Sequence, residues 1–201
     1  QRLQAAGELG LLLRQAQARF DVHHQVFIAR ITSEPIYELK MAFAHHAHLC
    51  AEHATAIRQR VSEMREPPLG LDEVPHPALA VFFEEIAAAP RTEAFLAGYR
   101  LAVIGLTNVI AEYDADTNPL TDAPSRRILR FASLEFDDIL KWVTEAYKVL
   151  RQSSTDAERG KWLKLLNELG RVAGWLDGAH PSSNVLPERY YSATPPPPSP
   201  P

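Results

Sequence analysis

Apolar side chains recur along most of this chain at the three- and four-residue spacing of an α-helix, and the alternating pattern of β-hairpins is nearly absent. Clusters of Pro, Asn, Asp and Ser interrupt that spacing and mark the breaks between helices. The pattern predicts helices over about residues 3–31, 35–65, 78–88, 91–114, 124–150 and 156–176. We therefore expect an all-α fold, an antiparallel four-helix bundle with a short connecting helix and an additional C-terminal helix.

The end of the chain differs from the rest, because it holds turn-forming residues and closes on the run PPPPSPP. A proline run favours an extended polyproline conformation over a packed core. The sequence predicts a single helical domain over residues 1–177 and an extended Pro-rich tail over residues 178–201.

The predicted helix over residues 35–65 carries the densest polar cluster of the chain, with histidines, a carboxylate and the only cysteine. Successive side chains on a helix are turned by roughly 100°, which divides this cluster in two. One group shares a face with apolar residues and is predicted to point inward: His46, Cys50 and His53. The other group is predicted to face solvent: His45, His48 and Glu52.

Polar residues also interrupt the apolar faces of the other long helices. Glu135 stands in a stripe that we draw through Ile128, Phe131, Ile139, Trp142 and Ala146, with Asp138 flanking it. A buried carboxylate without a partner costs several kcal/mol or shifts its pKa until it is neutral. Glu135 therefore requires a partner, and an imidazole or a metal ion would serve. His24 is placed on the inner face of the first helix, and Tyr99 and Tyr113 on that of the helix over residues 91–114.

If these helices pack together, their polar residues could meet in the interior. The candidate metal ligands are His24, His46, His53, Glu135 and Asp138. The candidate catalytic groups are Glu135, Asp138, Tyr99 and Tyr113. Each also has a structural interpretation, as a hydrogen-bonded core histidine, a packing tyrosine or, for Cys50, a small core hydrophobe.

Composition limits the classes of partner. The chain has 201 residues, of which 46% are hydrophobic and 23% charged, as in an ordinary globular domain. A net charge of −4 gives no reason to expect nucleic acid. Apolar runs such as LAVIGL fall well short of the roughly 20 residues that span a membrane, and one cysteine favours a reducing compartment. We expect a cytoplasmic protein that acts on a small-molecule substrate, without nucleic acid or membrane as partner, and a homodimer stays open.

Three stretches carry a family resemblance: YELKMAFAHHAHLCAEHATAIRQRVSEMREPP, PHPALAVFFEEI and TNPLTDAPSRRILR. They resemble uncharacterised ferritin-like helical-bundle proteins over about residues 34–142. The resemblance implies a ferritin-like bundle, in which one Glu on each of two helices and Glu-x-x-His on the other two hold two metal ions. The match is incomplete, because Asp138 replaces the His of one Glu-x-x-His and His24 stands where the first helix would supply Glu. With these departures, a histidine-rich mononuclear site, or a site that has lost its metal and works by acid–base chemistry, fits as well as the dinuclear centre.

The sequence leaves three functions open. The first is a metal-dependent oxidoreductase, in which the histidines and Glu135 hold iron or manganese and Asp138 completes the shell. The second is a metal-free enzyme that uses Glu135 or Asp138 as general acid or base. The third is a non-catalytic bundle that binds a partner or ligand, with its polar residues in a satisfied buried network. Because burying histidine and carboxylate is costly unless something compensates, the sequence favours the first.

Overall fold

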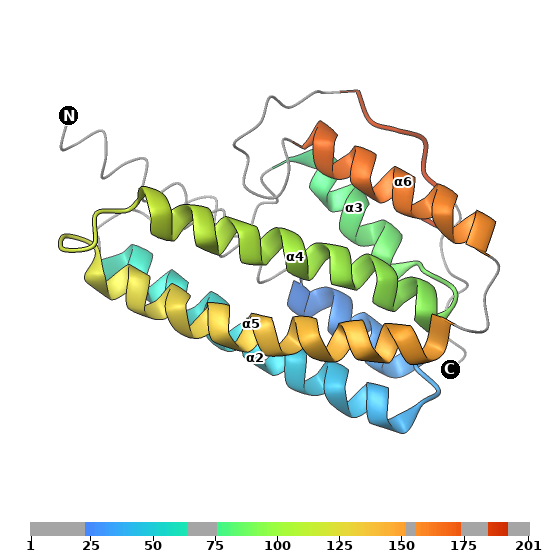
Figure 1. Cartoon of the computed structure of the whole chain (residues 1–201), viewed down its shortest axis with the longest axis horizontal. Coiled ribbons are helices and arrows are strands. Elements are labelled where there is room, and N and C mark those ends of the chain that lie inside the picture. Colours follow the sequence, from blue (N-terminus) through green and yellow to red (C-terminus); the bar gives the residue numbers. More distant parts are fainter. Residues whose placement is uncertain (1–22, 64–75, 152–155, 174–184, 193–201) are drawn as a thin grey trace.

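The computed structural model describes residues 23–63, 76–151, 156–173 and 185–192, and within these ranges its regular structure is helical (Figure 1). A helical segment covers residues 23–33. The helices that follow are α2 (Tyr37–Glu63), α3 (Pro77–Ala87), α4 (Thr92–Asp116), α5 (Ala123–Leu150) and α6 (Asp156–Val172). The prediction of an all-α fold is confirmed, and α2 to α5 begin and end close to their predicted positions. The predicted start of the first helix and the proline run lie outside the described residues.

Local residue chemistry accounts for several helix starts. Pro77 stands in the first turn of α3, where its missing N–H costs nothing, and Nδ1 of His76 accepts the backbone N–H of Ala78 at 3.1 Å. Before α5, Oδ1 of Asn118 accepts the N–H groups of Leu120 and Thr121, which forms the turn after α4.

The long helices lie side by side, and α5 contacts both α2 and α4. Each of these two neighbours runs antiparallel to α5 (Figure 1). α3 and α6 pack on each other and against α4, on the side away from α2 (Figure 1). The helical segment 23–33 is joined to α2, since Nδ1 of His24 donates to the carbonyl of Ala47 at 2.8 Å.

Buried positions in α2, α4 and α5 follow one another at alternating spacings of four and three residues. On α2 they are Leu39, Phe43, His46, Cys50, His53 and Ile57; on α4 Phe95, Tyr99, Ala102, Leu106, Val109 and Tyr113; on α5 Ser125, Leu129, Ala132, Phe136, Ile139 and Val143. This spacing is typical of long helices that pack at shallow angles. The predicted inward group on α2 is confirmed, and His45, His48 and Glu52 are exposed as predicted.

On α5 the predicted apolar stripe is confirmed only in part: Ile139 is buried and Ile128, Trp142 and Ala146 pack partly buried against the core, but Phe131 is misplaced. Phe131 is 54% exposed, whereas Ser125 and Ala132 are fully buried. The prediction followed the large side chains, but the face in contact with α4 includes small ones, which let the two helices approach closely. Glu135 consequently lies beside the buried face, toward α2, and not in its middle.

α4 is long and apolar enough to cross a membrane by length and composition, and 61% of its most apolar window is buried inside the protein. Burial on this scale is typical of a central core helix. Its Gly98 allows α6 to lie close, because a Cβ at this position would come within 2.6 Å of Cη2 of Trp162.

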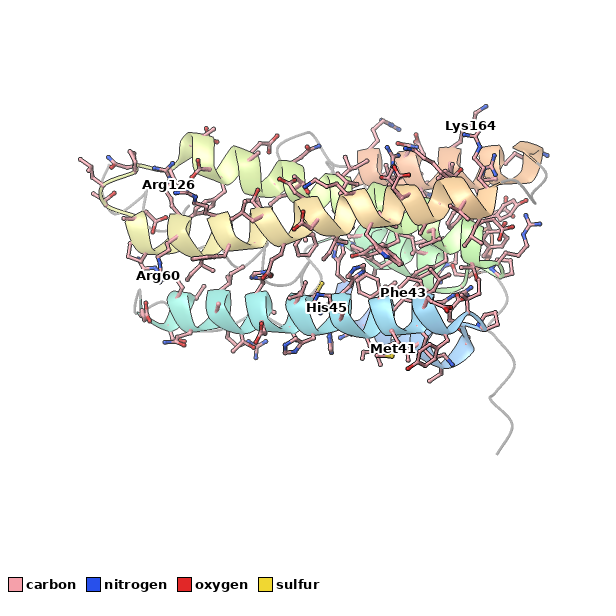
Figure 2. All side chains as sticks on the ribbon, turned by 60° about the horizontal axis from the view of Figure 1, so that its bottom comes forward. Met41, Phe43, His45, Arg60, Arg126 and Lys164 are labelled. Carbon is pink, nitrogen blue, oxygen red and sulfur yellow. The ribbon has the colours of Figure 1, made fainter. Side chains whose placement is uncertain are left out.

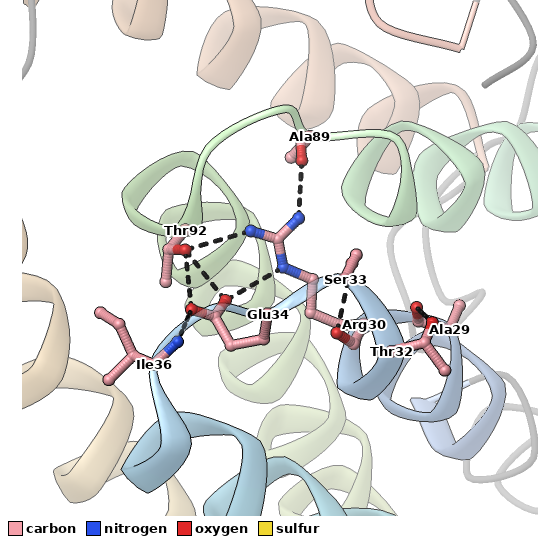
Figure 3. A network of polar contacts seen from close by, with 8 residues as sticks. All are labelled: Ala29, Arg30, Thr32, Ser33, Glu34, Ile36, Ala89 and Thr92. Atoms are coloured by element: carbon pink, nitrogen blue, oxygen red, sulfur yellow. Dashed lines mark hydrogen bonds and ion pairs between the residues drawn. The ribbon is translucent and has the colours of Figure 1, made fainter. Parts of the chain in front are cut away.

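A buried ion pair ties three parts of the chain together (Figure 3). Nε of Arg30 donates to Glu34 at 3.3 Å, and the other two guanidinium nitrogens donate to the Ala89 carbonyl and the Thr92 hydroxyl, each at 3.1 Å. The hydroxyl of Thr92 donates in turn to Glu34. Glu34 also accepts the N–H of Ile36, just before α2 begins. The network thereby joins the end of segment 23–33 to the starts of α2 and α4.

A second buried carboxylate, Glu85 of α3, is surrounded by donors. The backbone N–H groups of Tyr190, Tyr191 and Ser192 donate to it at 2.8–3.0 Å, and the Ser192 hydroxyl does so at 2.7 Å. Nε1 of Trp162 adds a bond of 3.2 Å. Burial alone would raise the pKa of Glu85, but these hydrogen bonds outweigh it and lower the pKa. Residues 190–192 of the predicted tail therefore contact α3 and α6, while the domain boundary at residue 177 stays a prediction.

Candidate functional site

Two of the predicted site residues meet, on α2 and α5. Nε2 of His53 lies 2.6 Å from Oε2 of Glu135. The His53 side chain is 9% exposed and that of Glu135 is 41% exposed, so the imidazole is held inside and the carboxylate reaches solvent. The prediction that Glu135 requires an imidazole or metal partner is matched by this contact.

Asp138 does not point into the interior. Its side chain is 78% exposed, and it accepts a hydrogen bond from Nζ of Lys141 at 2.9 Å. The interior position expected for Asp138 is therefore wrong, for the same reason that Phe131 of α5 was misplaced.

The first helix presents a different histidine to the core than expected. His24 is half-buried and donates to Ala47, whereas His23 is fully buried among the rings of Phe83, Tyr99 and Phe136. Neighbouring residues on a helix point about 100° apart. The pattern of apolar residues at the start of the chain was not sharp enough to show whether His23 or His24 faces the core.

His46 and Tyr99 are buried as predicted. His46 packs edge-on against Phe27 and Trp142. Within the described residues, Nδ1 of His46 and the hydroxyl of Tyr99 have no hydrogen-bond partner. Burial, aided by the neighbouring His45, lowers the pKa of His46 to about 4. Burial likewise raises the pKa values of the Tyr99 hydroxyl and the Cys50 thiol. These groups are therefore uncharged at neutral pH.

Tyr113 is engaged by its own chain. Its hydroxyl donates to Asp122, which also accepts a hydrogen bond from Ser125. Arg60 of α2 donates to Ser125 at 2.9 Å and reaches Asp122 at 3.5 Å. Burial and the bond to Asp122 raise the pKa of Tyr113. The cluster fixes the last turn of α2 against the loop between α4 and α5, which is a structural task.

The predicted metal ligands do not assemble. Among the described residues there is no group of three or more His, Cys, Asp or Glu side chains that could hold a metal ion. His46 and His53 are two helical turns apart, about 10 Å along the axis, which is too far for one coordination sphere. Protein metal centres of this chemistry use three or more side chains, so the described residues do not fit iron or manganese.

A cavity of about 670 Å³ opens elsewhere, where α4 and α5 are joined. It is lined by Ile110, Ala111, Asp114, Pro119, Ala123, Arg126, Arg127, Leu129, Arg130 and Ser133. Figure 2 shows Arg126 at this end of the molecule, near the loop that joins the two helices. The sequence prediction missed this cavity. The sequence feature that could have indicated the cavity is the SRRILR segment, which places arginines about one turn apart at the start of a helix.

The three arginines of the cavity differ in their contacts. Arg126 forms a two-pronged pair with Asp114, with distances of 2.5 Å and 2.9 Å, and this pair lowers the pKa of the Asp114 carboxyl. Arg127 lies over the ring of Phe131 at 5.5 Å. Arg130 forms no hydrogen bond or ion pair within the described part of the chain, but its charge also helps to lower the pKa of the Asp114 carboxyl. The described lining thus carries three cationic groups and one anionic group.

Comparison with protein-family models, with curated proteins and with solved structures finds no match for this chain. Any function must therefore be argued from the chemistry of its own residues.

Proposed function

We propose that the protein is a non-catalytic binding protein that takes up an anionic small molecule in the cavity between α4 and α5. The observation that carries this proposal is the lining: among the described residues, three arginines and one carboxylate border a cavity of about 670 Å³. Small-molecule sites typically enclose about 300–1,000 Å³ and combine apolar walls with a few polar groups. Ile110 and Leu129 supply apolar wall here.

Arginine is well suited to such a ligand. Its guanidinium stays charged at every physiological pH and presents parallel N–H donors that match a carboxylate or a phosphate. Ala123, which begins α5, also borders the cavity. The positive end of the α5 dipole therefore adds to the attraction for an anion.

The proposal omits catalysis because three of the four candidate catalytic residues are engaged elsewhere, and the fourth, Tyr99, is buried in the core away from the cavity. Glu135 contacts His53, Asp138 contacts Lys141 and Tyr113 donates to Asp122. None of the three lines the cavity. These contacts support the third function that the sequence left open, a bundle that binds a ligand without catalysis, although the buried His46 and Tyr99 side chains are not part of a satisfied network in the described residues.

Titration calorimetry with citrate, pyrophosphate and inorganic phosphate tests the proposal. We expect saturable binding of at least one of these anions, weaker at high salt. Arg130→Ala should raise its Kd about tenfold or more, the usual effect of losing a charge-assisted hydrogen bond. Arg100→Ala is the matched control, since Arg100 is an exposed arginine of α4 that bonds Thr144 outside the cavity. Absence of binding, or equal losses in both variants, would overturn the proposal.

A second candidate, a metal-free acid–base enzyme, rests on the contact between His53 and Glu135. The carboxylate reaches solvent and the imidazole supports it from inside, so Glu135 would exchange the proton with a substrate. A screen of ester, lyase and isomerase substrates with wild-type protein and Glu135→Gln tests this function. Turnover that survives a chelator and is lost in Glu135→Gln would support it, and turnover that persists in the variant would refute it.

The metal-dependent oxidoreductase and the ferritin-like resemblance both stay predictions. Elemental analysis of protein purified without chelator tests them directly. Iron or manganese at one ion per chain would favour this function over the other two, and no metal bound or taken up would refute it.

A further inference from the structure

The pair between Arg126 and Asp114 occupies the cavity in the way an anionic ligand would. Both carboxylate oxygens of Asp114 face the guanidinium, at 2.5 Å from Nε and 2.9 Å from a terminal nitrogen. Both residues line the cavity. An incoming carboxylate or phosphate group would use the same two donors with the same geometry.

This pair is also easily exchanged. The side chain of Asp114 is 52% exposed and that of Arg126 is 31% exposed. Exposed ion pairs contribute little to stability because water solvates both partners when they separate. Asp114 further lies close to the C-terminal end of α4, where the helix dipole disfavours a negative charge. Helix stability therefore gives no reason for a carboxylate at this position.

Arg130 offers a second anchor, which acts on Asp114 through its charge but forms no ion pair with an acidic side chain of the described residues. It stands one helical turn beyond Arg126 on α5, borders the same cavity and has no ion-pair partner in the described ranges. A ligand with a single acidic group would bind Arg130 and leave the pair intact. A ligand with two acidic groups could bind Arg130 with one of them and replace Asp114 on Arg126 with the other.

We infer that Asp114 is a built-in competitor for the ligand, and that the cavity selects small molecules with two acidic groups, the second of which displaces Asp114 from Arg126. This inference rests on the proposed binding function. It adds the class of ligand and a residue that restrains the affinity.

Asp114→Asn is the decisive variant, because it keeps the shape of the side chain and removes the charge that holds Arg126. We expect the Kd for citrate or pyrophosphate to fall about three- to tenfold. Asp116→Asn is the matched control. Asp116 lies two residues after Asp114 and does not line the cavity, so the variant removes the same charge from outside the site. We expect the change in log Kd in this control to be less than half of the change in Asp114→Asn.

A double-mutant cycle distinguishes competition between Asp114 and the ligand for Arg126 from a general change in the electrostatic potential of the cavity. Arg126→Ala should weaken citrate binding more in the Asp114→Asn background than in the wild-type protein, because Arg126 is then free to bind ligand. Acetate, with a single acidic group, should show no such coupling. If Asp114→Asn weakens binding or leaves it unchanged, Asp114 orients Arg126 for the ligand or plays no part, and the inference fails while the binding function stands. If no anion binds to either the wild-type protein or Asp114→Asn, the proposed function itself fails.

Discussion

Two arginine–carboxylate pairs show how differently this molecule uses the same chemistry. Arg30 and Glu34 have side chains that are 8% and 0% exposed, and every contact partner they use comes from the chain itself. Arg126 is half-buried and Asp114 is exposed, and both line a cavity. The first pair holds three elements together, and the second can open without disturbing the core. The difference shows that the position of a charge, more than its type, decides whether it is part of the buried framework or accessible from the cavity, where the proposed ligand would bind.

The largest effect is expected from Arg30→Ala. The change leaves Glu34 buried without its cation, and breaking a buried pair in this way costs about 3–5 kcal/mol. Urea unfolding at neutral pH measures the loss of free energy of unfolding. Arg126→Ala is the comparison variant and should lose only a small part of that amount. Equal losses in the two variants would remove the distinction between the pairs.

A smaller effect is expected from acid, through His46. Burial lowers the pKa of His46 to about 4 from a usual value of 6.5, so the folded protein holds the neutral ring. Below pH 6.5 the unfolded chain takes up a proton that the folded protein does not, and stability is lost as the pH falls toward 4. The linked change amounts to about 3 kcal/mol.

Urea unfolding at pH 7 and pH 4.5 checks this expectation. His46→Phe, which keeps a ring between Phe27 and Trp142, should lose less stability between the two pH values than the wild-type protein. His48→Gln controls for an exposed histidine of the same helix. A wild-type pH dependence that His46→Phe leaves unaltered would contradict a neutral buried His46.

The smallest effect concerns the half-buried pair of His53 and Glu135, which lies between the two extremes. Glu135→Gln keeps a hydrogen-bonding group next to the imidazole and removes the charge. Because the Glu135 side chain is 41% exposed, solvent screens much of the interaction, and we expect a loss of about 1 kcal/mol or less. Thermal unfolding at neutral pH measures it. A loss as large as that of Arg30→Ala would place this pair among the buried structural ones.

Much of the fold could be predicted from the sequence, because periodicity and helix breakers are local signals. The inward position of His46, Cys50 and His53 on α2 follows from angles along one helix. On α5 the same reasoning was misled by Phe131, since the exposed ring outweighed the buried Ser125 and Ala132 in the pattern. Choosing between adjacent faces requires knowing which helix lies opposite, and a single helix does not contain that information.

The site was less predictable for a related reason. The contact of Glu135 with His53 was foreseeable as a need for a partner, but the partner's identity depends on how α2 lies against α5. The cavity arginines were overlooked because charged residues at the start of a helix are ordinarily solvated. What distinguishes Arg130 is the hollow beside it, which appears only when α4, the following loop and α5 come together.

The donors around Glu85 have a consequence for folding during synthesis on the ribosome. Three backbone N–H groups that satisfy this carboxylate lie 105 to 107 residues later in the chain. While residues 190–192 are still within the ribosome, α3 carries a negative charge on a face made for burial, with Trp162 as the one other donor to it in the described chain. The full set of donors to Glu85 is therefore complete only after residues 190–192 have been translated, so that a later segment of the chain stabilises a helix made much earlier.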